Sequence, residues 1–354
     1  MPTPELGFPP HERRSRGRES APSLRNDAGK TGIPARRRAA PALILGALAT
    51  GWLQAQPALF PTPRPQPRFP DKPNHSFYVN ARYFVQQTGY EELWRRHHGH
   101  LPTGQGVVMA QVENGVADPA QFKDKRILFV PNFKPAANAR GHENTTGRIL
   151  YSSTPHADQQ AVFEYGFSPG VTTVYAFTSD QFRKHVLKLP SHNTRGGLAP
   201  GWNGASVDVL NLSNTLGNGG EKNTVRSLDA LIDTANVLAF TSQPGSLQRN
   251  ESVAGVLWNA LVVGKASPDL GYAEGAVFEN VGLVPRPKPD LASASYIHRD
   301  GGASSWATPT VASGGAMLLE RARATQSTQS ATNNYVMKAI ILAGATKTGL
   351  SSPV

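Results

Sequence analysis

The sequence predicts an α/β domain of three layers, with a mainly parallel central sheet, from about residue 77 to residue 354. Short apolar runs bounded by polar or glycine-containing segments recur along this part of the chain. Runs of about four to eight apolar residues are typical of strands that are buried on both faces. Segments with the length and pattern of helices lie between several of these runs, and such alternation favours a parallel sheet covered by helices.

Each element has its own local signal. The first helix should end before Gly99, and the strand that follows it is the apolar run GVVMAQV at residues 106–112. One helix leads directly into a strand at residue 237, and a small-residue helix near the C-terminus should pack tightly. The expected helices are 90–98, 228–236, 308–323 and 335–342, and the expected strands are 106–112, 172–177, 206–212, 237–241 and 259–264.

The N-terminal part is predicted to precede the folded domain. Residues 1–55 resemble a disordered basic leader with a signal-peptide-like segment, in which three arginines at 36–38 precede an apolar run at 39–53. The alternative is a disordered tail with an apolar patch. The run is too short and too interrupted for a membrane span. Residues 56–76 are a proline-rich linker. A signal peptide predicts a secreted or periplasmic protein.

Composition narrows the function classes. The chain contains no cysteine, so disulfides and thiolate metal sites are excluded. Nine basic and four acidic residues in the first 40 supply nearly half of the net charge of +11, and basic residues are not interleaved with aromatic ones. This argues against a nucleic-acid partner. A GQG sequence at residues 104–106 precedes a strand instead of linking a strand to a helix, so it does not indicate nucleotide binding. We expect no cofactor and no metal, and the oligomeric state stays open.

The sequence GASSWATPTVASGGAML at residues 302–318 carries the clearest chemical signal. It resembles the motif of the subtilisin-like serine peptidases, G-T-S-[MF]-A-[ST]-P-x-V-A-G-x-x-A-L, which implies that Ser305 is the nucleophile. A serine at a helix N-terminus suits acyl transfer, because free backbone N–H groups there favour developing negative charge. Pro309 fits the first turn of a helix. The alternative is a buried Ala/Gly-rich helix with a serine cap.

Three further segments match motifs of this family in the right order. Residues 104–115 resemble G-x-G-V-x-V-A-V-[IL]-D-[ST]-G, with Glu113 where the family has its catalytic Asp. Residues 206–214 resemble the strand that pairs with substrate backbone, which implies that Ser213 and Asn214 bind substrate; a plain core strand is the alternative. In residues 237–245, Gln243 takes the place of the family's oxyanion-stabilising Asn, and its alternative is a solvated loop glutamine.

The catalytic histidine is harder to place. His156 precedes a segment at 166–176 that resembles the family's G-V-A-P-x-A-x-[VL]-Y-A, and we expect His156 to be the general base. The competitor is His142, which keeps a glycine five residues on but lies further from that segment.

The resemblance implies a serine endopeptidase that cleaves polypeptide through an acyl-enzyme. Ser305 would attack, His156 would transfer the proton, Glu113 would orient the imidazole, and Gln243 would bind the oxyanion. The alternative is a catalytically silent module of the same fold that binds peptides or partners. The chain also ends sooner after its last expected helix than this family usually does, which predicts a C-terminal truncation.

Overall fold

The computed structural model describes most of the chain between residues 88 and 345. The described ranges are 88–97, 100–129, 141–153, 166–189, 201–202, 206–214, 216, 222–243, 257–266, 273–274, 277–281, 284–295 and 303–345. The expected leader at 1–55 and the expected linker at 56–76 lie outside these ranges, so both stay predictions.

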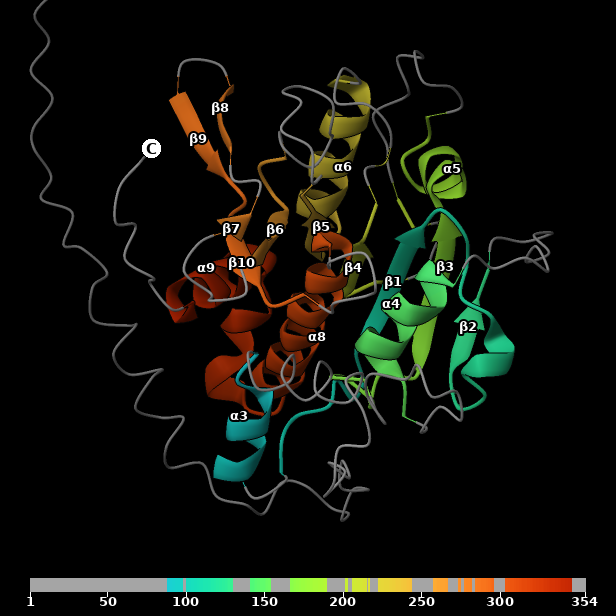
Figure 1. Cartoon of the computed structure of the whole chain (residues 1–354), viewed down its shortest axis with the longest axis vertical. Coiled ribbons are helices and arrows are strands. Elements are labelled where there is room, and N and C mark those ends of the chain that lie inside the picture. The colour runs from blue at the N-terminus through green and yellow to red at the C-terminus, as the bar shows by residue number, and fades with distance from the viewer. Residues whose placement is uncertain are drawn as a thin grey trace, which may run out of the picture. The chain divides into compact units, whose positions relative to one another are not determined.

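A parallel sheet forms the centre of the described structure (Figure 1). Its strands are hydrogen-bonded in the order β10-β6-β5-β4-β1-β3-β2, and every pairing along this path is parallel. The short β7 joins β6 antiparallel, and β8 pairs with β9 in a separate hairpin. The strands are β1 (Val108–Glu113), β2 (Arg126–Leu128), β3 (Thr173–Thr178), β4 (Val209–Leu212), β5 (Leu238–Ser242), β6 (Leu261–Ala266), β7 (Ala273–Glu274), β8 (Val277–Val281), β9 (Val284–Lys288) and β10 (Leu291–Ser293).

Helices cover both faces of the sheet, as the sequence predicts. Two separate clusters of buried apolar side chains lie on its two faces, and β1 contributes Met109 to one and Ala110 to the other. Residues of α4, α8 and α9 belong to the first cluster, and residues of η3 and α6 belong to the second. The helical elements are α3 (Tyr90–Arg96), η2 (Pro119–Gln121), α4 (His142–Tyr151), α5 (Ser179–Gln181), η3 (Phe182–Val186), α6 (Lys222–Thr234), α8 (Ser304–Arg323), η4 (Gln326–Thr332) and α9 (Asn334–Gly344).

The three-layer α/β fold with a mainly parallel sheet is therefore confirmed, and each expected helix and strand is present near its expected position. Two helices begin earlier than expected: α6 starts at Lys222 and α8 at Ser304. The sequence analysis did not anticipate α4. Its sequence HENTTGRILY includes asparagine, two threonines and an internal glycine, which have low helix propensity. Burial of Ile149, Leu150 and Tyr151 in the core stabilises it instead.

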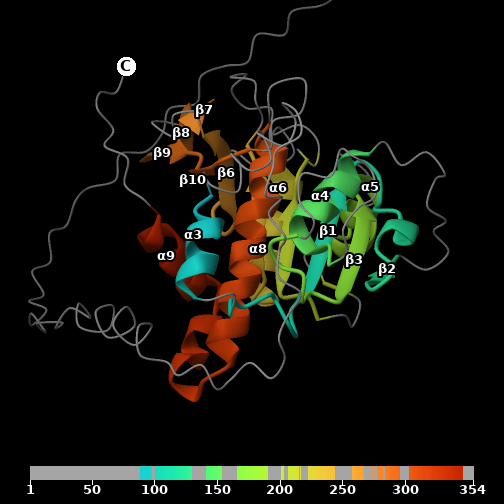
Figure 2. The ribbon, with the colours of Figure 1, turned by 60° about the horizontal axis from the view of Figure 1, so that its bottom comes forward.

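Helix α8 runs along the sheet with α4 beside it (Figure 2). Its small residues allow a close approach to β5, because Ala312 and Ala316 are fully buried and Gly315 leaves room for two side chains of that strand. A Cβ atom at Gly315 would lie 2.6 Å from the Phe240 ring and 2.9 Å from Leu238. Small residues at this face therefore set the distance between α8 and the sheet.

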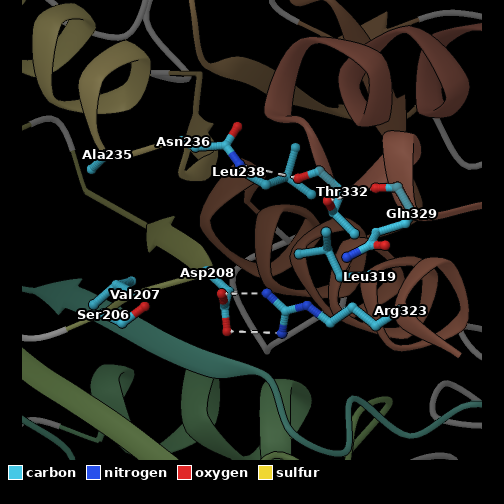
Figure 3. Close-up of a pocket in the computed structure, with 10 residues that line it drawn as sticks. All are labelled: Ser206, Val207, Asp208, Ala235, Asn236, Leu238, Leu319, Arg323, Gln329 and Thr332. Carbon is cyan, nitrogen blue, oxygen red and sulfur yellow. Dashed lines mark hydrogen bonds and ion pairs between the residues drawn. The ribbon is translucent and has the colours of Figure 1, made fainter. Parts of the chain in front are cut away.

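The C-terminal half of α8 is tied to the beginning of the sheet. Glu320 accepts hydrogen bonds from three consecutive backbone N–H groups, those of residues 103–105, at 2.5, 2.7 and 3.0 Å. Arg323 pairs with Asp208 (Figure 3). Asp208 also accepts a hydrogen bond from the Val108 N–H at 2.8 Å. Asp208 and Arg323 border a pocket of about 300 Å³ at the amino ends of the strands. Both contacts fix α8 relative to β1.

Within the described residues, no helix is long and apolar enough to cross a membrane.

Candidate active site

The carboxyl end of β1 lies at a switch in strand order. The strands β2 and β3, which follow β1 in the chain, lie on one side of β1, and β4 lies on its other side. The chain connections therefore lead in opposite directions from this point of the sheet. Such a point leaves a crevice beyond the strand ends, where α/β proteins commonly bind ligands. Glu113 is the last residue of β1, and Gln243 directly follows β5. The strands β1, β4 and β5 are parallel neighbours, so their carboxyl ends bring these two side chains to the same edge of the sheet.

Ser305 is the second residue of α8, and the N-terminal turn of that helix is held by neighbouring strands. The Ser295 hydroxyl, just after β10, donates to the Ala303 carbonyl at 2.6 Å and accepts from the Ala303 N–H at 3.0 Å. The Ser304 hydroxyl donates to the Gln243 carbonyl. Ser305 therefore lies where backbone N–H groups have no partner within the helix.

The helix start corrects the expected place of Pro309. Because α8 begins at Ser304, Pro309 lies inside the helix in its second turn, and not in its first turn. Proline has no N–H to bond with the carbonyl four residues earlier, which here belongs to Ser305. The proline therefore leaves the Ser305 carbonyl without its usual helical hydrogen bond.

His142 joins Ser305 to Glu113. It is the first residue of α4, after Gly141 in a left-handed conformation with φ of 83°. Its Nε2 atom lies 3.0 Å from the Ser305 hydroxyl oxygen, and its Nδ1 atom lies 3.1 Å from Oε2 of Glu113. The Glu113 side chain is 2% exposed and that of His142 is 36% exposed, so the acid is enclosed while the imidazole reaches the surface. The arrangement is that of an acid, a base and a nucleophile.

The structure thus places His142 in the position that the sequence analysis expected for His156. His156 itself lies outside the described residues. The prediction of His156 rests on distance along the chain to the segment at 166–176, and in the structure α4 carries the chain between the site and that segment. The chain returns alongside α4, with the N–H groups of Phe167 and Ser168 bonded to the carbonyls of Ile149 and Leu150.

The buried carboxylate makes the imidazole more basic. Burial of the ring lowers the pKa of His142, but its hydrogen bond to Glu113 and the negative charges of Glu113 and Glu143 outweigh this and raise the pKa above its usual value. Burial also raises the pKa of the Glu113 carboxyl, an effect that the contact with His142 opposes. The His142 imidazole therefore holds its proton to a higher pH than a solvated histidine does.

A buried hydrogen-bond chain sets α4 against β1, and the sequence analysis assigned no role to its members. Tyr151 donates from its hydroxyl to Oε1 of Gln111 at 2.7 Å, and Gln111 donates from Nε2 to the Glu143 carbonyl at 2.8 Å. Gly115 leaves space for the Glu143 carboxylate, since a Cβ atom there would lie 2.7 Å from its Oε1. These contacts fix the first turn of α4, and with it His142, beside the end of β1. A buried glutamine inside an otherwise apolar strand was the available signal.

Gln243 lies next to the first turn of α8. Its side chain is buried, its backbone N–H donates to the Val263 carbonyl at 2.9 Å, and its own carbonyl accepts from Ser304. The burial argues against the solvated-loop alternative. Its part in binding an oxyanion remains a prediction.

Ser213 and Asn214 follow β4 at the same edge, and both are buried. The Asn214 amide donates to the Ser179 hydroxyl at 2.6 Å and accepts from the Leu216 N–H at 3.1 Å, while Ser213 accepts from Asn211 at 2.9 Å. Their side chains therefore shape the segment itself. Any contact with substrate would come from its backbone, and that role remains a prediction.

In the described part of the chain, no group of three or more His, Cys, Asp or Glu residues is arranged to hold a metal ion.

No family model matches the sequence, and no curated protein matches it. Among solved structures, a cold adapted subtilisin-like serine proteinase is 18% identical, with 71% of this chain and 86% of that chain covered at a TM-score of 0.48. The patellamide maturation protease PatG is 12% identical, with 74% and 88% covered at a TM-score of 0.49. The prenylagaramide maturation protease PagA is 15% identical, with 66% and 81% covered at a TM-score of 0.41. The chain is thus similar to subtilisin-like proteases of known structure.

Proposed function

We propose that the protein is a divergent subtilisin-like serine endopeptidase that cleaves polypeptides through an acyl-enzyme on Ser305. The observation that carries this proposal is the placement of His142, with one ring nitrogen 3.0 Å from the Ser305 hydroxyl and the other 3.1 Å from Glu113. Three groups from β1, α4 and α8 meet in the order that nucleophilic catalysis needs.

In the proposed mechanism, the Ser305 oxygen attacks the peptide carbonyl while His142 takes the hydroxyl proton. The resulting imidazolium is stabilised by Glu113, and the tetrahedral oxyanion is bound by the Ser305 N–H and the Gln243 amide. His142 then gives its proton to the leaving amine, and the peptide C–N bond breaks. A water molecule attacks the acyl-enzyme in the second half, again with His142 as base, and releases the acid.

The side-chain lengths support an adapted site more than a decayed one. Glutamate and glutamine each add one methylene to the residues that the family uses, yet Glu113 still reaches His142. The carboxylate and amide functions are both retained. The segment at Ser213 and Asn214 would pair its backbone with extended substrate at the same edge. With its expected leader, the enzyme would act outside the cytoplasm, as a secreted or periplasmic protein.

The test is covalent labelling of the full-length protein with a serine-directed fluorophosphonate, together with hydrolysis of an unfolded protein. We expect labelling and cleavage, and we expect Ser305→Ala to abolish both without a change in thermal stability. Ser327→Ala is the matched control, because Ser327 is an exposed serine of η4 outside the site. Absence of both signals in well-folded protein would remove the peptidase and support the catalytically silent, peptide-binding module.

A further inference from the structure

Trp306 lies against the imidazole of His142. The two ring centroids are 4.3 Å apart and their planes are inclined by 32°. Aromatic rings attract each other at such distances, and an indole face also attracts a cation within about 6 Å of its centroid. The contact therefore acts on His142 in both of its protonation states, and most strongly when the ring is charged.

The contact supplies a restraint that the other two partners of the ring do not. Glu113 and Ser305 hold the two nitrogens of His142, so both act at the ring edge. A ring held only at its two edge atoms can still tilt about the line that joins those contacts. Trp306 packs on the face of the ring and opposes this tilt.

The position of Trp306 makes this restraint dependable. It directly follows Ser305 on α8, and its backbone N–H donates to the Ala303 carbonyl at 2.9 Å. Ala303 is itself held by Ser295. The indole is thus attached to the same short segment as the nucleophile. Any movement of that segment would therefore move the Ser305 hydroxyl and the Trp306 indole together.

We propose that Trp306 is a positioning residue, which keeps the His142 ring in line with the Ser305 hydroxyl and stabilises the imidazolium that forms during acyl transfer. This inference rests on the proposed function, because it assigns Trp306 to the same site. The charged groups near the ring, Glu113 on β1 and Glu143 on α4, act in the same direction by raising the pKa of His142. Trp306 adds a contribution at the face of the ring.

The experiment compares Trp306→Leu and Trp306→Phe in the full-length protein, by kcat/KM for a fluorogenic peptide between pH 5 and 9. Stabilisation of the imidazolium raises the pKa of the base, so its loss should move the acid limb of the Trp306→Leu profile to lower pH. We also expect kcat/KM at its plateau to fall about threefold to tenfold in Trp306→Leu. Trp306→Phe should recover most of both effects, since it keeps an aromatic face. Trp258→Leu is the matched control, because Trp258 is half exposed and lies before β6.

Two results would overturn the proposal. One is a folded Trp306→Leu protein with unchanged plateau and unchanged acid limb. The other is an equal loss in both variants with no movement of the limb, which would show a merely structural role. Should Trp306→Leu fail to fold, Trp306→Met, a flexible apolar side chain of intermediate size, takes its place with the same expectations.

A second readout separates this inference from the proposed function. The Cε1 proton of His142, assigned by its loss in His142→Ala, should show a ring-current shift and a pH titration in the wild type. Both should change in Trp306→Leu, whether or not the protein turns over substrate. Failure of fluorophosphonate labelling with a changed His142 resonance would remove the peptidase and leave only the packing of Trp306 on His142, whereas an unchanged His142 resonance would remove the role of Trp306.

Discussion

Shortening the acid of the site by one methylene is the most informative perturbation. In Glu113→Asp the carboxylate would retreat by about one C–C bond, roughly 1.5 Å. The distance from its oxygen to Nδ1 of His142 is now 3.1 Å, and it would grow to roughly 4.6 Å, beyond the range of a hydrogen bond. The imidazole would lose both its orienting partner and much of the charge that stabilises it.

We expect kcat/KM of Glu113→Asp to fall about 10-fold to 100-fold, because the charge remains in the site although the contact is lost. Glu113→Gln keeps the length and removes the charge, so its loss should be larger, on the order of 10³–10⁴. The missing methylene would also leave a small cavity, since Glu113 is almost fully buried. We expect this to cost about 0.5–1.5 kcal/mol of folding free energy.

The assay is kcat/KM with a fluorogenic peptide, with thermal melting as the control for folding. The reasoning assumes that the site has adapted to glutamate. A Glu113→Asp enzyme that is as fast as the wild type, or faster, would refute it and would mark glutamate as a defect at this position.

Three further outcomes follow from the structure. His142→Ala should abolish fluorophosphonate labelling while His156→Ala leaves it intact, and the opposite result would restore His156 as the base. The acid limb of the wild-type pH–rate profile should lie above the usual pKa of histidine, because Glu113 and Glu143 raise the pKa of His142. Glu143→Gln should move that limb to lower pH. A limb that does not move in this variant would exclude the charge effect of Glu143. In α8, Gly315→Ala should destabilise the protein by about 1–3 kcal/mol, because the new Cβ atom would clash with Phe240. The Cβ atom of Gly314→Ala would have no atom within 4 Å, so this change should stabilise the protein by up to about 1 kcal/mol. Equal effects of the two changes in thermal unfolding would contradict the packing argument.

Most of the fold was predictable because its strands are continuous apolar runs. The segments at 106–112 and 237–241 are as apolar as strands covered on both faces must be, and both are central in the sheet. The helix boundaries were predicted less well, since α6 and α8 both begin earlier than expected. The start of α8 at Ser304 depends on contacts from Ser295, eight residues before Ala303, and from Gln243, which is distant in the sequence.

The nucleophile and its acid could be proposed from local motifs, because each lies at the end of an element with a recognisable pattern. The choice between His142 and His156 could not be made in this way, because α4, which carries His142, has the composition of a loop. Its helical state depends on burial of Leu150 and Tyr151 and on the amide of Gln111, which is more than thirty residues away.

By itself, the sequence determined the α/β class and the parallel sheet, since both follow from the length and spacing of apolar runs. It also singled out Ser305, Glu113 and Gln243 through local patterns. Only the tertiary structure decided that His142 lies between Glu113 and Ser305 and that Trp306 covers the face of its ring. These contacts join residues from β1, α4 and α8. Hydrophobic periodicity predicts single elements, and it does not predict how three elements pack together at one edge of a sheet.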